Sequence, residues 1–448
     1  MFERNIQKEL TRWGNDKYRK PLVLRGARQV GKTTVVSRFA ENFDNFLPVN
    51  LEKKQAKELF ESTDDVKQLL PLLFLYCDIS QKKGKTLLFI DEIQNSPHTV
   101  SLLRYFYEEL PEIYVIAAGS LLETMLDKHI SLPVGRVEYL ALYPCSFLEF
   151  LNATGENRFA EPILNVALPA VFHDSVMQLF KTFSLVGGMP EAVARYADNK
   201  DIIGLKRIYN QLINTYKNDV EKYAENKTQA EVIRYIIDYG WNFAGEAITF
   251  GSFAGSSYKA RETGEAFRTL QKAMLLELTY PVTSAKMPVV SELKRSPKLF
   301  WLDAGLVNYN AKIQKEYIMH SDLLDTWRGK AAEQIVAQEL KTISFEVGEK
   351  QNFWVRQQRG SNSEVDLISV FDGQIIPIEV KSGHNAHLKS LHLFMDECPH
   401  DWAVRVWSKP FSIDKVKTQA GKEFNLINLP FYYVGVLEKV LEKGMNEK

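Results

Sequence analysis

The sequence predicts an α/β protein of three parts: an N-terminal domain built on a parallel sheet, a mostly helical middle part, and an α/β domain at the C-terminal end. Short apolar runs alternate with helix-like segments over the first third of the chain, helical periodicity dominates the middle, and strand-like alternation returns after it. A chain of 448 residues is also too long for one hydrophobic core. We expect domains over residues 1–160, 161–320 and 321–435.

Composition points to a soluble protein of the cytoplasm. The 56 Lys and Arg residues balance the 56 Asp and Glu residues, so net charge indicates neither a nucleic-acid nor a membrane partner. Cys77, Cys145 and Cys398 are widely spaced and form neither a disulfide framework nor a CxxC metal pair. No apolar run approaches the roughly 20 residues that span a bilayer, and the charged N-terminus lacks a secretory pattern.

A glycine-rich loop follows the first apolar run, at residues 21–24, and precedes a helix-like segment. Its spacing matches GxxxxGK[ST], in which backbone N–H groups and the helix N-terminus bind phosphate. Lys32 would reach the β- and γ-phosphates, as a binding and catalytic residue, and Thr33 would bind Mg²⁺. The predicted cofactors are therefore ATP and Mg²⁺. The predicted nucleotide-binding residues of the loop are Gly26, Ala27, Arg28, Gln29, Val30, Gly31, Lys32, Thr33 and Thr34.

A second apolar run, at residues 87–90, ends in two acidic residues. It has the length and composition of a buried parallel strand. Asp91 would bind the Mg²⁺ hydration shell, together with Thr33, and Glu92 would orient and deprotonate the attacking water. The adjacent acid at position 92 therefore predicts hydrolysis of ATP rather than binding alone.

Two further residues could complete this site. Strands are expected at residues 46–51 and 113–118, and an extra strand between the Mg²⁺ strand and the P-loop strand is typical of P-loop ATPases with a catalytic glutamate. Ser120 follows the second of these strands, where it could sense the γ-phosphate, or it could be a loop serine without a role. Arg136 could be an arginine finger, in cis or across a subunit boundary, or part of an ordinary surface ion pair.

These motifs resemble those of prokaryotic ATPases of the AAA superfamily. The loop reads GARQVGKT, the Mg²⁺ strand ends in DEIQ (residues 91–94), and a GR…YPxSFxEF pattern follows at residues 135–150. The resemblance covers nearly the whole chain. It implies an ATPase domain followed by a C-terminal region that is similar to the PD-(D/E)XK nuclease fold. Because AAA relatives often form rings, it also implies that an oligomer could form.

The middle part carries two further segments found in the similar proteins: a GGMPE turn at residues 187–191 and the motif PKLFWLDAGL at residues 297–306. The resemblance implies a winged-helix stretch between them. Its basic residues Lys259, Arg261 and Arg268 could meet DNA phosphates or form a solvated face. A winged helix can also serve only to pack against an ATPase.

The C-terminal part predicts a second charged site. A helix is expected at residues 331–340, and strands at 353–356, 364–370 and 374–380. A hairpin would bring Asp366 to Glu379 and Lys381, which share one strand face. Asp366 and Glu379, with Glu333 from the helix, could bind a second divalent metal, and Lys381 could position water.

This constellation resembles the PD-(D/E)XK core, with Val365-Asp366 in place of Pro-Asp. The same fold is often kept as a binding module without cleavage, and the residues could also be a surface pair beside a strand. Two functions follow. The first is an ATPase coupled to a DNA-associated, nuclease-like domain. The alternative is a signalling ATPase whose C-terminal domain recognises protein or DNA without catalysis. A scaffold that binds ATP with little turnover is a third reading, against which Glu92 argues.

Overall fold

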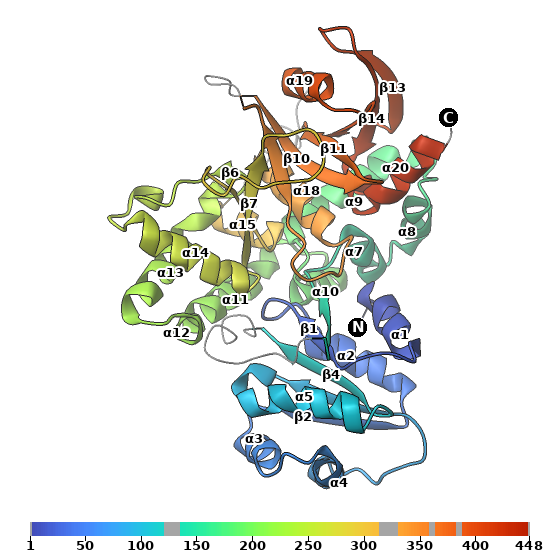
Figure 1. Cartoon of the computed structure of the whole chain (residues 1–448). Helices are drawn as coiled ribbons and strands as arrows, with labels where there is room; N and C mark the ends of the chain where they lie inside the picture. The colour runs from blue at the N-terminus through green and yellow to red at the C-terminus, as the bar shows by residue number, and fades with distance from the viewer. Residues whose placement is uncertain (1, 121–134, 313–329, 358–362, 382–387, 447–448) are drawn as a thin grey trace.

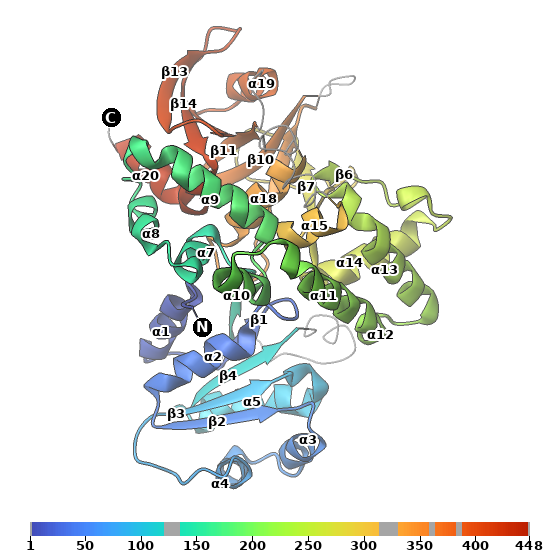
Figure 2. The same cartoon turned by 180° about the vertical axis from the view of Figure 1, so that it is seen from behind.

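The computed structural model describes residues 2–120, 135–312, 330–357, 363–381 and 388–446. Its strands form two sheets. The first sheet (blue to teal in Figure 1) lies at one end of the molecule, the second (yellow to red) lies toward the other, and the helices of the middle part (mostly green) run between and beside them (Figures 1 and 2). The predicted boundary between residues 320 and 321 lies outside the described residues.

The first sheet is parallel throughout, and β4 lies between β3 and β1, as the sequence predicts for this class of ATPase. Side chains alternate along its strands, so that Leu22 and Leu24 pack on one face with the first two helices, while Val23 packs on the other. In spatial order the strands are β2 (Asn45–Asn50), β3 (Thr86–Asp91), β4 (Tyr114–Gly119), β1 (Leu22–Arg25) and β5 (Glu138–Ala141).

Helices cover both faces of this sheet. One face packs with the first two helices through Leu10, Trp13 and Val36, and the other with the next three through Phe60 and Leu103. The helices are α1 (Ile6–Asn15), α2 (Lys32–Phe39), α3 (Lys54–Glu61), α4 (Val66–Tyr76) and α5 (Pro97–Glu109). The strands β3 and β4 are buried on both faces. For this reason their sequences, at residues 87–90 and 113–118, are continuous apolar runs rather than alternating ones.

The second sheet is mixed. In spatial order its strands are β13 (Ser412–Lys417), β14 (Glu423–Pro430), β12 (Trp402–Trp407), β11 (Gln374–Val380), β10 (Glu364–Phe371), β9 (Asn352–Val355), β7 (Leu276–Val282), β8 (Lys298–Trp301) and β6 (Glu246–Ala247). The predicted hairpin is confirmed: Phe371 pairs with Gln374 across the turn, and both Asp372 (φ 46°) and Gly373 (φ 68°) are left-handed. A two-residue turn of this kind matches the twist of antiparallel strands.

The described residues of the middle part are mostly helical, as expected, but three strands of this part also join the second sheet. β6, β8 and β7 pair antiparallel, and β7 then pairs with β9 in parallel, with Tyr280 opposite Asn352. The sheet therefore continues from the middle part into the C-terminal part. Five of the seven residues of β7 are buried and the other two are half-buried. Both faces of the strand are therefore largely covered, and this hides the strand period in the sequence.

The remaining helices surround this sheet and link it to the first. They are α7 (Phe147–Thr154), α8 (Asn157–Leu164), α9 (His173–Val186), α10 (Pro190–Asn199), α11 (Lys206–Asn218), α12 (Val220–Tyr223), α13 (Lys227–Tyr239), α14 (Ala260–Lys272), α15 (Ala304–Asn310), α18 (Lys330–Lys341), α19 (Lys389–Glu397) and α20 (Leu437–Asn446). One hydrophobic cluster contains Leu22 of β1, Phe183 of α9, Ile335 of α18 and Leu367 of β10. Within the described ranges, no helix combines the length and apolar character that crossing a membrane requires.

Glu339 of α18 connects the C-terminal part to the ATPase part. Its carboxylate oxygens accept the backbone N–H of Phe147, at the start of α7, at 3.0 and 3.2 Å. Nearby, the N–H of Ala141, the last residue of β5, donates to the carbonyl of Phe345 at 2.7 Å. Burial raises the pKa of Glu339 from its ordinary value to about 8, although the Phe147 N–H offsets part of this effect.

We expect Glu339→Gln to remove a pH dependence of stability. The folded-state pKa of Glu339 lies above the unfolded one, so its contribution to stability is complete below about pH 4.5 and is lost as the pH rises toward 8. Between pH 5 and pH 8, the free energy of unfolding of the wild type should therefore fall relative to the variant by about 3–4 kcal/mol. Urea unfolding at both pH values measures this, and a constant difference would contradict it.

Candidate active site

The P-loop follows β1 and bends sharply into α2. Gly31, the last residue before the helix, has φ 97°, and Gln29 has φ 66°. Gly31 therefore occupies a left-handed conformation that favours glycine. A Cβ at Gly26 would lie 2.5 Å from the carbonyl oxygen of Leu142, so this position also excludes a side chain. The two glycines of the motif are thus required by the backbone, and the loop leads into the N-terminus of α2.

Lys32 is the first residue of α2 and is buried. Its Nζ donates to the carbonyl oxygens of Gly26 and Ala27, each at 3.0 Å, so the ammonium lies under the loop. Burial lowers the pKa of Lys32 to about 8, although Glu92 and Asp91 oppose this shift. Phosphate would supply the negative charge that the buried ammonium lacks.

Thr33 and Asp91 meet across the site. The Thr33 hydroxyl donates to Asp91 Oδ2 at 2.8 Å, and Asp91 is the buried last residue of β3. A hydroxyl and a carboxylate at this distance, beside a phosphate-binding loop, fit a hydrated Mg²⁺, which takes few protein ligands and keeps several waters. The described residues therefore suit Mg²⁺ bound together with ATP. Both predicted ligands are brought together by the fold.

Glu92 follows in an unusual conformation. Its backbone is left-handed (φ 54°, ψ 43°), which is uncommon for a residue other than glycine and is often found at functional sites. Gln94 Nε2 donates to Glu92 Oε2, and this bond holds the carboxylate. Glu92 also contributes to the electrostatic field at Lys32 and Arg28. The predicted general base thus lies at the same sheet edge as the P-loop and has a fixed orientation.

Ser120 lies at the C-terminal ends of the parallel strands, and Arg136 lies at their N-terminal ends. Ser120 is buried and directly follows β4, at the edge where the P-loop and Asp91 lie. Arg136 precedes β5, whose first residue pairs with Leu22, the first residue of β1. Its guanidinium forms an ion pair with Glu108 at 2.9 Å. An arginine finger for the chain's own ATP site does not fit this position, because the P-loop follows the other end of β1.

Three residues to which the sequence assigns no role contribute to the site: Arg4 and Asp219 hold the loop, and Gln94 holds Glu92. Arg4 is buried and donates to the carbonyl oxygens of Val30 at 3.0 Å and Tyr143 at 2.7 Å. Asp219, after α11, forms an ion pair with Arg28. The third is Gln94, whose place in the DEIQ motif was the only available signal; nothing in the local pattern distinguishes Arg4 or Asp219.

The acidic residues predicted for the C-terminal site also lie close together, but they surround a lysine, Lys298, to which the sequence analysis gives no role in this site. Lys298, the first residue of β8, has a side chain that is only 3% exposed, and its Nζ lies 2.7 Å from Glu333 Oε2 and 2.7 Å from Glu364 Oε1. Asp366 Oδ1 lies 3.9 Å away. Lys298 was noted only as part of the PKLFWLDAGL motif. We call Lys298, Glu333, Glu364 and Asp366 the Lys298 cluster.

The second predicted pair lies beside this cluster. Lys381 Nζ is 2.7 Å from Glu379 Oε1, and Asp366 Oδ2 accepts the backbone N–H of Val380 at 2.7 Å. Burial, reinforced by the neighbouring Asp366 carboxylate, raises the pKa of both Glu333 and Glu379. Burial alone would lower the pKa of Lys298, but the carboxylates around it raise it.

The prediction of a second metal site here is not met. Among the residues that the structure describes, no three His, Cys, Asp or Glu side chains are grouped so that they could hold a metal ion. The physical reason is that the acidic side chains direct their oxygens at the ammonium groups of Lys298 and Lys381. These residues, as arranged, do not fit a divalent cation.

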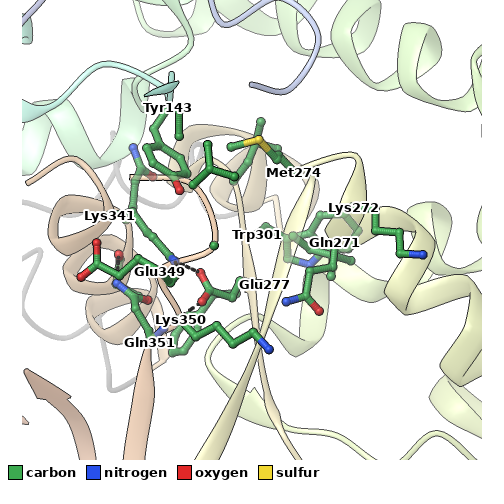
Figure 3. A pocket seen from close by; sticks show the side chains of 18 of the residues that line it. Tyr143, Gln271, Lys272, Met274, Glu277, Trp301, Lys341, Glu349, Lys350 and Gln351 are labelled. Atoms are coloured by element: carbon green, nitrogen blue, oxygen red, sulfur yellow. Dashed lines mark hydrogen bonds and ion pairs between the residues drawn. The ribbon is translucent and has the colours of Figure 1, made fainter. Parts of the chain in front are cut away.

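A cavity of about 360 Å³ lies elsewhere, where the ATPase part meets α14 and α18. Figure 3 shows Tyr143 on one side of it and the Lys341–Glu277 ion pair, at 2.9 Å, on the other. None of the P-loop residues 26–34 lines this cavity, although Arg25, which precedes the loop, does. Its position makes it part of the contact between domains rather than of the ATP site.

Comparison with known families agrees with the geometry at the N-terminal site. Residues 18–151 match the AAA domain family. The N-terminal segment is an AAA-type P-loop ATPase domain. Residues 177–317 match a domain of unknown function (DUF8612), and residues 328–431 match another (DUF4143), so neither description names an activity. No curated protein matches the chain.

Solved structures with similarity to the chain are distant. A Walker-type ATPase of Pyrococcus abyssi is 14% identical with a TM-score of 0.43, over 69% of this chain and 96% of that one. PCH-2 of C. elegans is 11% identical with a TM-score of 0.28, over 45% and 65% of the two chains. A signal-transduction ATPase with a tetratricopeptide repeat sensor from Pyrococcus horikoshii is 11% identical with a TM-score of 0.28, over 74% and 47%.

Proposed function

We propose that the chain hydrolyses ATP with Mg²⁺ and acts as a nucleotide-operated switch whose C-terminal part is a recognition module. The observation that carries the ATPase proposal is the convergence of Lys32, the Thr33–Asp91 pair and Glu92 at one edge of a parallel sheet. Mg²⁺, when bound, would compensate phosphate charge. Lys32 would bind the β- and γ-phosphates, and Glu92, held by Gln94, would accept the proton of the attacking water.

The switch proposal is supported by contacts between the P-loop and the middle part. Arg28 of the loop is paired with Asp219, and the Tyr216 hydroxyl donates to the Arg28 carbonyl at 3.4 Å. Pro190, at the start of α10, lies near Gly31: its Cγ would be 3.6 Å from a Cβ built there. Phosphate bound by this loop would meet the same groups, so a change in nucleotide state could move the middle part.

We further propose that α13, β6, α14, β7 and β8 form a winged-helix unit that packs against the ATPase part. The element order and the antiparallel β6–β8–β7 arrangement support this. Arg268 and Lys272 of α14 line the same cavity as Arg25 and Tyr143, which belong to the ATPase part. That face of α14 therefore faces the ATPase part of the protein. Salt-dependent binding of duplex DNA that Arg268→Ala abolishes would contradict the packing role.

The C-terminal part fits a recognition module better than a nuclease, because its acidic groups are engaged by Lys298 and Lys381. A cytoplasmic location, an oligomer, and a role for Arg136 across a subunit boundary remain proposals. The role of Arg136 is tested by whether Arg136→Ala lowers turnover only at concentrations at which the chain self-associates. Titration of the chain with candidate protein partners in the presence of ATP or ADP tests for a nucleotide-dependent partner.

The test of the ATPase proposal is phosphate release by the purified chain with Mg²⁺ and with EDTA, beside Lys32→Ala. We expect turnover that requires Mg²⁺ and is lost in the variant, together with ATP binding, because the variant lacks the buried ammonium that lies under the loop. Turnover that persists in EDTA or in Lys32→Ala would show that the measured hydrolysis does not come from this site.

A further inference from the structure

We propose that Lys298 is a permanent internal cation that takes the place of a metal ion in the C-terminal part and keeps divalent metals out. The proposal does not depend on the ATPase function. It starts from the disagreement between the sequence, which predicts a metal site at Glu333, Asp366 and Glu379, and the structure, in which the described acidic residues form no metal-binding group.

The ammonium contacts one predicted metal ligand, Glu333, directly and lies 3.9 Å from a second, Asp366. Its nitrogen is 2.7 Å from an oxygen of Glu333 and 2.7 Å from an oxygen of Glu364, and it also donates to the carbonyl oxygen of Asp366 at 3.4 Å. These are distances of charge-assisted hydrogen bonds. Mg²⁺ needs oxygens at about 2.0–2.1 Å in octahedral array. An ion bound to these oxygens would therefore lie next to a buried positive charge, which would repel it.

Lys298 is also held in this place by the segment that carries it. Gln334, next to Glu333 on α18, accepts the N–H of Trp301 at 2.9 Å and donates to its carbonyl at 2.7 Å. One turn further along α18, Gln338 accepts the N–H of Ala304 at 2.7 Å. Three successive contacts of one helix thus fix the register of residues 298–304. These buried bonds fix the backbone that carries Lys298 beside Glu333 of the same helix.

The burial of the Lys298 side chain also supports its role as an internal cation. The Lys298 side chain is 3% exposed, whereas those of Glu333 and Asp366 are 14% and 15% exposed, so the cation lies deeper than these two carboxylates. Its Nζ also lies 5.0 Å from the centre of the Phe353 ring. A buried ammonium is retained only where several acceptors surround it. The cluster therefore joins β8, α18 and β10 through one shared charge.

The test is Mn²⁺ binding by the full chain without nucleotide, followed by electron paramagnetic resonance, in the wild type, Lys298→Gln and Lys298→Arg. We expect no saturable Mn²⁺ site in the wild type or in Lys298→Arg, which keeps the charge. Lys298→Gln should bind Mn²⁺ at least about tenfold more tightly, because it leaves the carboxylates without a cation. Adding Asp366→Asn to Lys298→Gln should remove this gain. Lys294→Gln, which changes an exposed lysine of the same segment, is the matched control.

Three results would overturn the proposal. The first is a saturable Mn²⁺ site in the wild type that Asp366→Asn abolishes, and this measurement is decisive even if Lys298→Gln does not fold. The second is a Lys298→Gln chain with wild-type circular dichroism that binds no more Mn²⁺ than the wild type. Cleavage of supercoiled or single-stranded DNA by the wild type in Mn²⁺, lost on Asp366→Ala, would also contradict a permanently closed cluster.

Discussion

Glu92→Gln should lower the rate of ATP hydrolysis by about a hundredfold or more, the range typical for loss of a general base, while ATP still binds. Glutamine has nearly the same shape and can still hydrogen-bond water, but it cannot accept the proton. The substitution leaves the backbone at position 92 unchanged, and the remaining amide oxygen can still accept the hydrogen bond from Gln94, so the local geometry should persist. Steady-state phosphate release and the affinity for a fluorescent ATP analogue measure the two effects.

The control for this prediction is Glu41→Gln, which changes an exposed acid after α2. It should leave both turnover and affinity unchanged. Equal turnover in Glu92→Gln and the wild type would show that the hydrolysis assignment is wrong. Loss of ATP binding in Glu92→Gln would instead show that the residue shapes the site, and the role of general base would then lack support.

The ATP site could be predicted because its chemistry is local. The P-loop occupies nine consecutive residues, and the conformations that it needs are set by Gly26 and Gly31 themselves. Asp91 and Glu92 end a strand whose apolar character is plain in the sequence. The carboxyl ends of parallel strands meet at one edge, and this brings Asp91 to Thr33 without further information. The hairpin at Asp372 and Gly373 was predictable for the same reason.

What could not be predicted depends on contacts between distant segments. Arg4 reaches the P-loop from before the first helix, and Asp219 reaches Arg28 across 191 residues. Arg136 was a candidate for the ATP site from its motif alone, but the pairing of β5 with β1 places it at the end of the strands opposite the P-loop. The clearest case is Lys298. A lysine within a motif can take many structural roles, and only the position of β8 beside α18 brings its ammonium to Glu333 and Glu364.

Asp303→Ala should lower the free energy of unfolding by about 3 kcal/mol or more, because it leaves several buried N–H groups without an acceptor. Asp303 lies five residues after Lys298 and has no exposed surface. Its carboxylate accepts the N–H of Gly188 at 2.5 Å and that of Leu306 at 2.9 Å, so it caps α15 and also holds the GGMPE turn. Urea unfolding measures the loss, with Asp198→Ala, on the exposed face of α10, as the control.

The same substitution should also weaken ATP turnover, although Asp303 is not part of the ATP site. The turn that it holds packs against Cys145, whose N–H donates to the Gly188 carbonyl at 2.7 Å, and ends at Pro190 beside Gly31 of the P-loop. Asp303→Asn keeps one acceptor oxygen and should fall between Ala and the wild type in both stability and turnover. If turnover of the folded fraction is unchanged in Asp303→Ala, the turn supports the fold alone, and nucleotide state must reach the middle part through Arg28 and Asp219.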